Sequence, residues 1–362
     1  MMPFNNKTYA KIALTMIMLF IILILAISCK ECPTEPENHN IPDTTSHNFV
    51  WEIDTLGEYG SKLMDVTIVD ENNILAVGDI NTDSGRFNAA KWDGDRWTVF
   101  DIEAQYMGSM TNPNLYRIFY FSENDIWITD FGYPFHWNGN KWTIYQLHDM
   151  GINASVGYGI WGMSSSNMYF VGINGNIVHY DGQKFTKIET HSDLRFYDVW
   201  GNSENDVYFC QYDISSRLSS VLYYDGQNLT SKYYFDSVDY ESKVLAGRVQ
   251  TIWAYGDTLY AGCSSGVWKE SLKTGEGKMK SWLDICGDWV YPNRIRGQEN
   301  NDIFVVGNWM KMAHYNGASW KSFSSVFGTV GDYFSVSIKG NLVCAVGRAN
   351  SAQAIIVTGR RF

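Results

Sequence analysis

Paired tryptophans around tight turns are the first residues in this sequence whose type and spacing suggest chemistry. The segment HWNGNKWTIY, residues 136–145, places Trp137 and Trp142 five positions apart around an Asn-Gly turn, as in a platform for a sugar ring. The same arrangement returns in KWDGDRWTVF (91–100), HYDGQKFTKI (179–188), YYDGQNLTSK (223–232) and HYNGASWKSF (314–323). Large aromatic residues that recur in every unit most simply pack between sheets. We therefore interpret these tryptophans as structural.

Three histidines occupy one position of this motif and could suggest a metal site: His136, His179 and His314. Equivalent points on separate strands lie far apart, so these side chains are not expected to converge on one ion. The turns SEND (122–125 and 203–206) and ENND (299–302) are explained by local backbone hydrogen bonds rather than by calcium. The spacing assembles no Ser/His/Asp set and no close carboxylate pair. We expect no metal and no cofactor, and we favour a non-enzymatic function.

A cysteine near the N-terminus follows a segment typical of export. Lys7 and Lys11 precede an apolar run over 12–27, which only Thr15 interrupts, and the run ends in the sequence AISC. This pattern predicts a secretory signal. The AISC segment resembles the lipobox of bacterial lipoproteins, which implies cleavage before Cys29 and lipidation of its thiol and new amine. A transmembrane anchor is the alternative, although 16 apolar residues fall short of the ~20 that span a bilayer.

The remaining N-terminal residues carry no apolar cluster before Phe49. We expect residues 1–28 to be a signal peptide and residues 29–47 to be a disordered, lipidated tether. The net charge of the whole chain is −11, which argues against a nucleic-acid partner. Of the other cysteines, Cys210, Cys263 and Cys344 fall in predicted strands, where a small apolar residue suffices.

The repeat itself predicts the fold. The glycines of the motif, Gly94, Gly139, Gly182, Gly226 and Gly317, are separated by 45, 43, 44 and 91 residues, and the last gap hides a degenerate unit at 251–271. Each unit reads as four short strands, and Asp-Gly or Asn-Gly predicts a tight hairpin in which both central residues have positive φ. Units of this length with four strands are typical of β-propeller blades.

Seven units can be counted, and the seventh has only three strands. The segment HNFVWEIDTL, 47–56, has the character of the missing fourth strand. We therefore predict an all-β fold over residues 48–362: a seven-bladed β-propeller of four-stranded antiparallel blades, closed by an N-terminal strand. The recurring elements W-G, N-D-[IV]-[YWF] and H-[YW]-[DN]-G-x-x-W resemble those of secreted bacterial propellers of the broad kelch and galactose-oxidase-like kind. The resemblance implies a propeller but not the copper site, whose ligands match no position here.

Long loops are expected on one face of the propeller, because the second loop of each blade and the link to the next blade share a face. Loops on a rigid scaffold concentrate binding residues. The candidate ligand-binding aromatics there are Tyr106, Tyr212, Tyr240, Trp289, Tyr291 and Trp309. The residues expected to open the seven first strands are Asp65, Arg117, Gly159, Asp198, Thr251, Arg294 and Ser335. We expect the charged members of this set to ring the channel mouth, either pairing with one another or orienting a polar ligand.

These observations favour a membrane-anchored, extracytoplasmic binding module that recognises a protein or a glycan through its long-loop face. The alternative is a carbohydrate-active hydrolase or lyase with its site at the channel mouth. The lipobox resemblance implies a bacterial cell envelope, with the chain on the outer membrane facing the periplasm or the cell surface. We expect a monomeric propeller that contacts the membrane only through its lipid.

Overall fold

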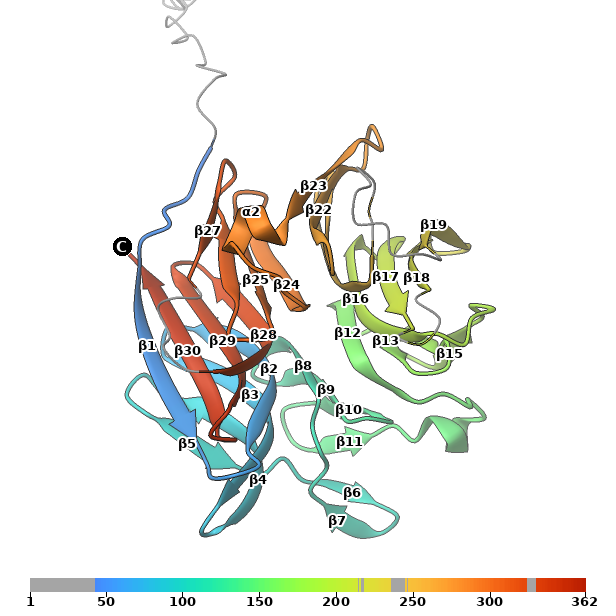
Figure 1. Ribbon diagram of the computed structural model, residues 1–362. Helices are drawn as coiled ribbons and strands as arrows, with labels where there is room; N and C mark the ends of the chain where they lie inside the picture. Colours follow the sequence, from blue (N-terminus) through green and yellow to red (C-terminus); the bar gives the residue numbers. More distant parts are fainter. Residues whose placement is uncertain (1–42, 214, 216–217, 236–244, 246, 324–329) are drawn as a thin grey trace, which may run out of the picture. The chain divides into compact units, whose positions relative to one another are not determined.

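The computed structural model describes residues 43–213, 215, 218–235, 245, 247–323 and 330–362. These residues form a seven-bladed β-propeller in which every blade is a four-stranded antiparallel sheet, which confirms the predicted fold (Figure 1). Among them there is no helix with both the length and the apolar character needed to cross a membrane. The predicted signal peptide and Cys29 lie outside the described residues.

In each of the first three blades the strands follow one another in sequence order from the channel outward. Blade 1 contains β2 (Lys62–Asp70), β3 (Asn73–Thr82), β4 (Gly85–Trp92) and β5 (Trp97–Phe100). Blade 2 contains β8 (Arg117–Ser122), β9 (Asp125–Thr129), β10 (Pro134–Trp137) and β11 (Trp142–Ile144). Blade 3 contains β12 (Val156–Ser164), β13 (Asn167–Gly172), β14 (Ile177–Tyr180) and β15 (Phe185–Ile188).

The next three blades repeat this order. Blade 4 contains β16 (Arg195–Ser203), β17 (Asp206–Tyr212), β18 (Ser219–Tyr224) and β19 (Leu229–Phe235). Blade 5, the degenerate unit, contains β20 (Val249–Tyr255), β21 (Thr258–Cys263), β22 (Gly266–Ser271) and β23 (Gly277–Ser281). Blade 6 contains β24 (Pro292–Glu299), β25 (Asp302–Gly307), β26 (Met312–Tyr315) and β27 (Trp320–Ser322).

Blade 7 is built from both ends of the propeller. Its first three strands, counted from the channel, are β28 (Gly331–Lys339), β29 (Leu342–Ala349) and β30 (Ala354–Arg361), and its outer strand is β1 (Phe49–Leu56). The β1–β30 ladder runs from the pair Phe49↔Arg361 to the pair Leu56↔Ala354. The Trp51 ring packs over Gly359, where an added Cβ would lie 2.4 Å from the ring. The N-terminal strand therefore closes the ring, as predicted, and leaves β30 with no open edge.

Three short elements lie in the connections between blades. A hairpin of β6 (Ala104–Tyr106) and β7 (Ser109–Thr111) lies between blades 1 and 2, and the 3₁₀-helix η1 (Leu147–Met150) lies between blades 2 and 3. Helix α2 (Trp282–Cys286) links blades 5 and 6, with the Ser281 side chain accepting a hydrogen bond from the N–H of Asp284. These segments therefore lie in the links between blades, on the face of the propeller where long loops were expected.

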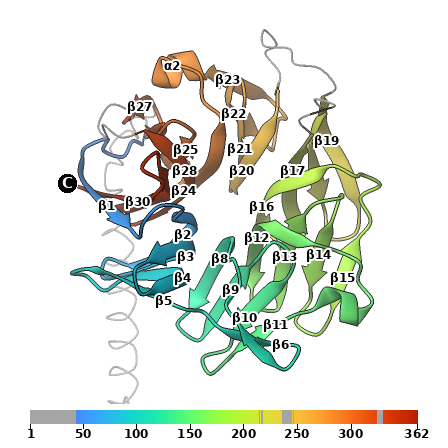
Figure 2. The same cartoon turned by 60° about the horizontal axis from the view of Figure 1, so that its bottom comes forward.

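The seven inner strands form a ring (Figure 2), and a cavity lined by residues of six of them lies in its central channel. Neighbouring inner strands contact one another around the whole ring, in the order β2, β8, β12, β16, β20, β24, β28 and back to β2. Each of them, except β8, carries a β-bulge directly before the residue that was predicted to ring the channel mouth, which we call its channel-facing residue. These six residues are Asp65, Gly159, Asp198, Thr251, Arg294 and Ser335. A bulge bends the strand and re-aims the extra side chain, so each bulge places an additional residue near the channel mouth.

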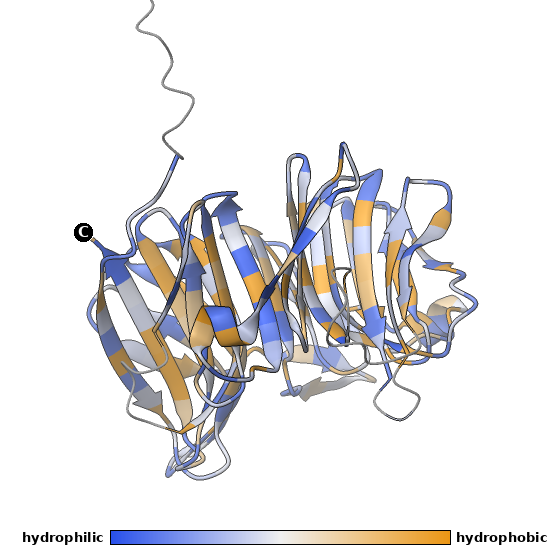
Figure 3. Ribbon diagram, turned by 45° about the horizontal axis from the view of Figure 1, so that its top comes forward, coloured by the Kyte–Doolittle hydropathy of each residue, from blue (hydrophilic) through white to orange (hydrophobic). Residues whose placement is uncertain are grey.

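The hydrophobic core lies between adjacent blades, and hydrophobic residues follow the strands while many turns are hydrophilic (Figure 3). In five blades an aromatic residue of the second strand fills the space toward the next blade: Trp127, Tyr169, Tyr208, Tyr260 and Phe304. We call each such space a wedge. The first strands add to this packing, since a Cβ on Gly201 would lie 2.6 Å from the Trp161 ring of the preceding blade.

The third turn of a typical blade differs from the predicted two-residue hairpin. In blade 1 the ladder ends at the pair Trp92↔Trp97, which leaves a four-residue loop. The Asp93 carboxylate accepts hydrogen bonds from the N–H groups of Asp95 and Arg96, which hold the pKa of Asp93 below its ordinary value. Gly94 has φ +97°, whereas Asp93 does not have a positive φ. The aspartate is therefore selected as a hydrogen-bond acceptor.

Candidate functional site

The channel contains a buried charge cluster at the level of the residues predicted to ring its mouth. Asp198 is fully buried and accepts hydrogen bonds from Arg294 Nη1 at 2.7 Å and from the Thr251 hydroxyl at 2.7 Å. Arg296 adds bonds of 2.8 and 2.9 Å to the same carboxylate. Burial alone would raise the pKa of Asp198, but Arg296 and Arg294 lower it to about 2. This carboxyl group is therefore an ionised acceptor and not a proton donor.

The other two charges are also tied to the framework. Asp65 accepts hydrogen bonds from the N–H of Ile118 in the next blade and from the Ser335 hydroxyl, and its Oδ2 lies 3.8 Å from Arg294 Nη2. Arg117 donates to the carbonyls of Met64 and Tyr158 at 2.9 and 2.8 Å. Burial and the charge of Arg294 lower the pKa of Arg117 to about 10. These hydrogen bonds link the inner strands of blades 1, 2 and 3 to one another.

The position of these charges differs in detail from the expectation. The inner strands, apart from β8, begin two to four residues before the channel-facing residue, so the charges lie inside the channel rather than at its edge. Their side chains are less than a tenth exposed. A cavity of about 240 Å³ occupies the channel on the side toward the first turns, with Arg296 and Lys339 in its lining.

The mouth itself is formed by the residues directly before the channel-facing ones; six of them lie in β-bulges, and Tyr116 precedes β8, which has no bulge there. The residues that form the mouth are Met64, Tyr116, Tyr158, Tyr197, Gln250, Asn293 and Phe334, and all are half-buried. Tyrosine occupies this position in three consecutive blades, and their ring centroids are 5.2 Å (Tyr116–Tyr158) and 6.0 Å (Tyr158–Tyr197) apart. Tyr197 stacks on Tyr212 at 4.2 Å, and the half-exposed Phe131 lies 4.6 Å from Tyr116. We call these five residues the aromatic arc.

Besides the buried Arg117, whose guanidinium lies 4.5 Å from the Tyr116 centroid, two arginines lie on the aromatic arc. The exposed Arg195 places its guanidinium 4.8 Å from the Tyr158 centroid and 5.7 Å from that of Tyr197. Arg248 lies 5.9 Å from Tyr212. Within the described part of the chain, neither guanidinium forms a salt bridge with a carboxylate. The arc therefore offers cation–π-supported positive charge that a ligand carboxylate can reach.

The other predicted ligand-binding residues fall into separate places. Tyr291 and Trp309 lie with ring centroids 5.6 Å apart beside blade 6, and Trp309 is half-exposed with φ +57°. Trp289, also half-exposed, precedes Tyr291 in the segment between α2 and β24, whereas Trp309 lies between β25 and β26. Tyr106 lies 6.2 Å from Tyr133, in the hairpin that packs beside the outer strand of blade 2. Tyr240 lies outside the described residues.

A Ser/His/Asp group does assemble between blades 2 and 3, although the spacing did not suggest one. His136 Nε2 lies 2.9 Å from Asp125 Oδ1 and 3.1 Å from Ser165 Oγ. Both partners thus approach the same ring nitrogen, whereas a nucleophilic triad needs the serine and the carboxylate on different nitrogens. His136 stacks on Trp127 at 4.4 Å, and the other two motif histidines also stack on second-strand aromatics. The described residues contain no group of three or more potential metal ligands.

The sequence contained a signal for the aromatic arc. The segments YRI (116–118), YGI (158–160) and YDV (197–199) align in the repeat, so tyrosine directly precedes the channel-facing residue in blades 2, 3 and 4 only. An aromatic residue that recurs in part of a repeat is a candidate for binding. The spacing alone gives no sign that Arg195 and Arg248 lie over tyrosine rings.

Comparisons with known proteins extend only to the fold. No protein-family description matches the sequence, and no curated protein matches it. Among solved structures, the chain is similar to "YCF48 bound to D1 peptide" at 12% identity, with a TM-score of 0.61 over 89% of this chain and 98% of that chain. It is also similar to "Crystal structure of WD40 beta propeller domain of Doa1" at 12% identity, with a TM-score of 0.60 over 87% and 98%. These similarities establish a propeller fold with WD40-type neighbours.

Proposed function

We propose that this chain is a membrane-anchored interaction module outside the cytoplasm, and that the aromatic arc binds a segment of a partner protein. The observation that carries the proposal is the run of five adjacent aromatic residues with Arg195 stacked on it at the channel mouth. Tyrosine and arginine are the residues most enriched among those that dominate binding energy at protein interfaces. The bound peptide of one structural neighbour fits the same kind of partner.

The chemistry of the arc favours a polypeptide with carboxylate groups over a glycan. A sugar would need open ring faces, but Tyr197 is stacked on Tyr212, and Arg195 covers part of Tyr158. What remains accessible is ring edges and guanidinium donors. Guanidinium groups form short, charge-assisted bonds to carboxylates, such as acidic side chains or a C-terminus.

A hydrolase or lyase finds less support from the same channel. Glycoside hydrolysis needs one carboxyl group that holds a proton near neutral pH. Asp198 has its pKa lowered to about 2, and Asp65 accepts bonds from a backbone N–H and a hydroxyl. Neither is arranged to donate a proton.

The anchoring and location are proposed from the sequence alone. The apolar run followed by AISC supports lipidation of Cys29 and attachment to the membrane of a bacterial cell envelope. Relationship to kelch and galactose-oxidase-like propellers is part of the same proposal and rests on the repeat motif. A monomeric propeller on a flexible tether would leave the aromatic arc free for a partner.

The proposal can be tested by capture from envelope extracts with residues 43–362, which form one compact unit. The double variant Arg195→Ala/Arg248→Ala should weaken the captured protein's binding at least tenfold, because both cationic contacts are lost. The matched control is Arg96→Ala/Lys184→Ala, which removes two exposed charges from third turns on the opposite face. If both double variants bind alike, or if only glycans are captured, the aromatic arc is not a protein-binding site.

A further inference from the structure

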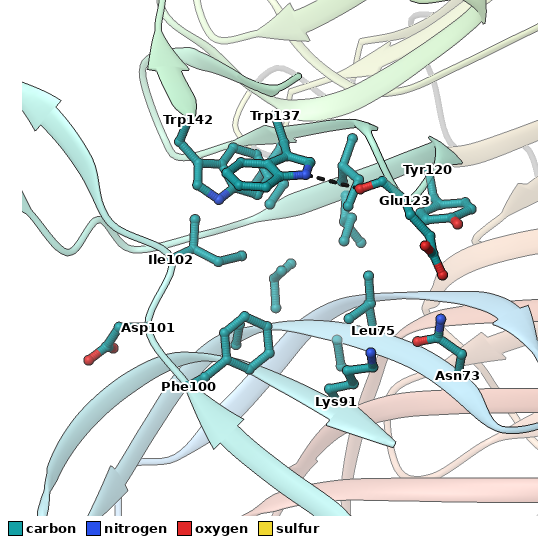
Figure 4. Close-up of a pocket in the computed structure, with 16 residues that line it drawn as sticks. Asn73, Leu75, Lys91, Phe100, Asp101, Ile102, Tyr120, Glu123, Trp137 and Trp142 are labelled. Atoms are coloured by element: carbon teal, nitrogen blue, oxygen red, sulfur yellow. Dashed lines mark hydrogen bonds between the residues drawn. The ribbon is translucent and has the colours of Figure 1, made fainter. Parts of the chain in front are cut away.

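The wedge between blades 1 and 2 differs from the five that an aromatic residue fills. Leu75 pairs with Lys91 across β3 and β4, just as Trp127 pairs with His136 across β9 and β10. Leu75 therefore occupies the position of the wedge-filling aromatic. In its place the wedge holds a cavity of about 470 Å³ (Figure 4).

The walls of this cavity match those around Trp127 in the next wedge. Trp127 lies 5.5 Å from Tyr145 and 5.4 Å from Tyr180. Their counterparts in the repeat, Phe100 and Trp137, both line the cavity, as does Trp142. Figure 4 shows Phe100 and Lys91 on one side, facing the two tryptophans of blade 2 on the other. The aromatic walls are present, and only the central ring is missing.

The polar end of this wedge also resembles that of the filled wedges. In three filled wedges the ring donates a hydrogen bond to the first turn of the next blade: Trp127 Nε1 to Ser165 Oγ, Tyr169 OH to the Glu204 carbonyl and Tyr260 OH to the Asn300 carbonyl, at 2.6, 2.9 and 3.3 Å. The residue at that turn position in the blade 1–2 wedge is Glu123, which lines the cavity. Its carbonyl accepts from Trp137 Nε1 at 3.0 Å, while its carboxylate accepts no hydrogen bond from any described residue.

We propose that the blade 1–2 wedge binds the indole or phenol ring of a tryptophan or tyrosine side chain from a partner polypeptide. The aromatic walls hold the ring, and the Glu123 carboxylate accepts the hydrogen bond of its N–H or O–H group. The exposed Lys91 and Asp101 lie at the rim, within reach of the peptide carbonyl and amide groups on either side. The predicted tether, residues 29–47, contains no aromatic residue that could supply the ring.

The probes are two capped peptides, Ac-Gly-Trp-Gly-NH2 and Ac-Gly-Leu-Gly-NH2, titrated into the purified full chain by calorimetry and ligand-observed NMR. The tryptophan peptide should saturate the site and the leucine peptide should bind at least tenfold more weakly. Glu123→Ala should weaken the tryptophan peptide about tenfold, because a charge-assisted hydrogen bond is lost. Glu71→Ala is the matched control, since it alters the same turn position next to a different wedge, and it should change nothing. Equal binding of both peptides, or binding of free indole but not of the tryptophan peptide, would overturn the proposal.

A filling variant tests the cavity without any ligand. Leu75→Trp should abolish peptide binding and raise the melting temperature, because the new ring completes the wedge as Trp127 does. Cys344→Trp places the same ring at the equivalent position of blade 7, where Cys344 is fully buried among packed aliphatic residues, and should lower the melting temperature. If Leu75→Trp also destabilises the fold, or leaves binding intact, the wedge is not an aromatic site. Arg195→Ala/Arg248→Ala should leave this binding unchanged, so the result is independent of the aromatic arc.

Discussion

Arg294 and Asp198, which are 96 residues apart in the chain, form an ion pair inside the channel with 2.7 Å between Nη1 and Oδ1. Arg294 belongs to blade 6 and Asp198 to blade 4, so the pair ties together two inner strands that are not neighbours in the ring. Both side chains are almost completely buried. The channel of this propeller is therefore held by charge as well as by packing.

Removing the Asp198 carboxylate should lower the free energy of unfolding. Asp198→Ala leaves Arg294 and Arg296 buried without their main acceptor, and breaking a buried pair in this way typically costs 3–5 kcal/mol, so we expect a loss of about that size. Urea denaturation of the variant and the parent measures it. Lys339→Ala, which removes a charge from the channel lining near the first turns, is the control and should cost less than about 1 kcal/mol. A loss below 1 kcal/mol for Asp198→Ala would contradict the role of the pair.

The same pair makes stability depend on acid. The pKa of Asp198 is lowered from 3.8 to about 2, so as pH falls below about 4 the unfolded chain takes up a proton that the folded chain does not. The stabilisation is complete above pH 4 and is lost as pH falls toward 2, by roughly 2 kcal/mol. Denaturation at pH 5 and at pH 2.5 should show a smaller difference in Asp198→Asn than in the parent. Identical pH dependence in both proteins would contradict this assignment.

The close approach of Trp161 to Gly201 predicts a strong effect of one methyl group. A Cβ at Gly201 would lie 2.6 Å from the Trp161 ring and 2.7 Å from the Asp206 carbonyl oxygen. Gly201→Ala should therefore destabilise the fold by about 2 kcal/mol, because the blades must move apart. Gly132→Ala is the control, since its Cβ would meet nothing closer than 3.7 Å. Thermal unfolding that does not separate the two variants would rule out this packing explanation of the repeated Trp-Gly motif.

The closing strand gives a further prediction about the fold. Deletion of residues 48–56 removes β1 and exposes the whole edge of β30, so we expect aggregation or loss of cooperative unfolding. Deletion of residues 30–42 should be close to neutral for the fold. Light scattering and calorimetry compare the two deletions. Equal tolerance of both would show that the ring does not depend on β1.

Anchoring is tested at a single residue. Cys29→Ala should abolish labelling of the protein by a palmitate analogue and block processing at the predicted cleavage position. Cys263→Ala, in strand β21, is a control that should label normally. Persistent labelling of Cys29→Ala would contradict the lipoprotein proposal, and Triton X-114 partitioning provides an independent readout.

The fold was predictable because the same turn signal recurs in five of the seven blades. Gly94 and its four counterparts fixed the period, and the aromatic Trp51 identified the strand that closes blade 7. The error at the third turn arose because Asp-Gly indicates a two-residue hairpin only when both residues take positive φ, and here Asp93 instead accepts two backbone hydrogen bonds.

The candidate site was less predictable because it depends on how deep each side chain lies in the channel and on which way it points. The sequence placed Asp198 and Arg294 near the channel, but only the structure shows that they neutralise one another below the mouth. The bulges that turn Tyr158 and Tyr197 toward the mouth have no residue signature of their own. Leu75 has no distinguishing feature as a strand residue. Only a comparison with the five aromatic residues at the equivalent position of other blades shows that it leaves its wedge without a ring.

The pairing of β1 with β30 also sets the order of events when the chain is made. The first strand of the propeller leaves the ribosome about 300 residues before its only sheet partner, a delay of roughly 15–60 s at the usual rate of synthesis. Throughout that interval β1 has no hydrogen-bonding neighbour, and blade 1, which follows it directly, has no blade 7 to pack against. The half-polar, half-apolar alternation of β1 suits a segment that must stay in solution and then dock last. A chain cut short anywhere before Ala354 therefore loses not one strand but the closure of the entire ring.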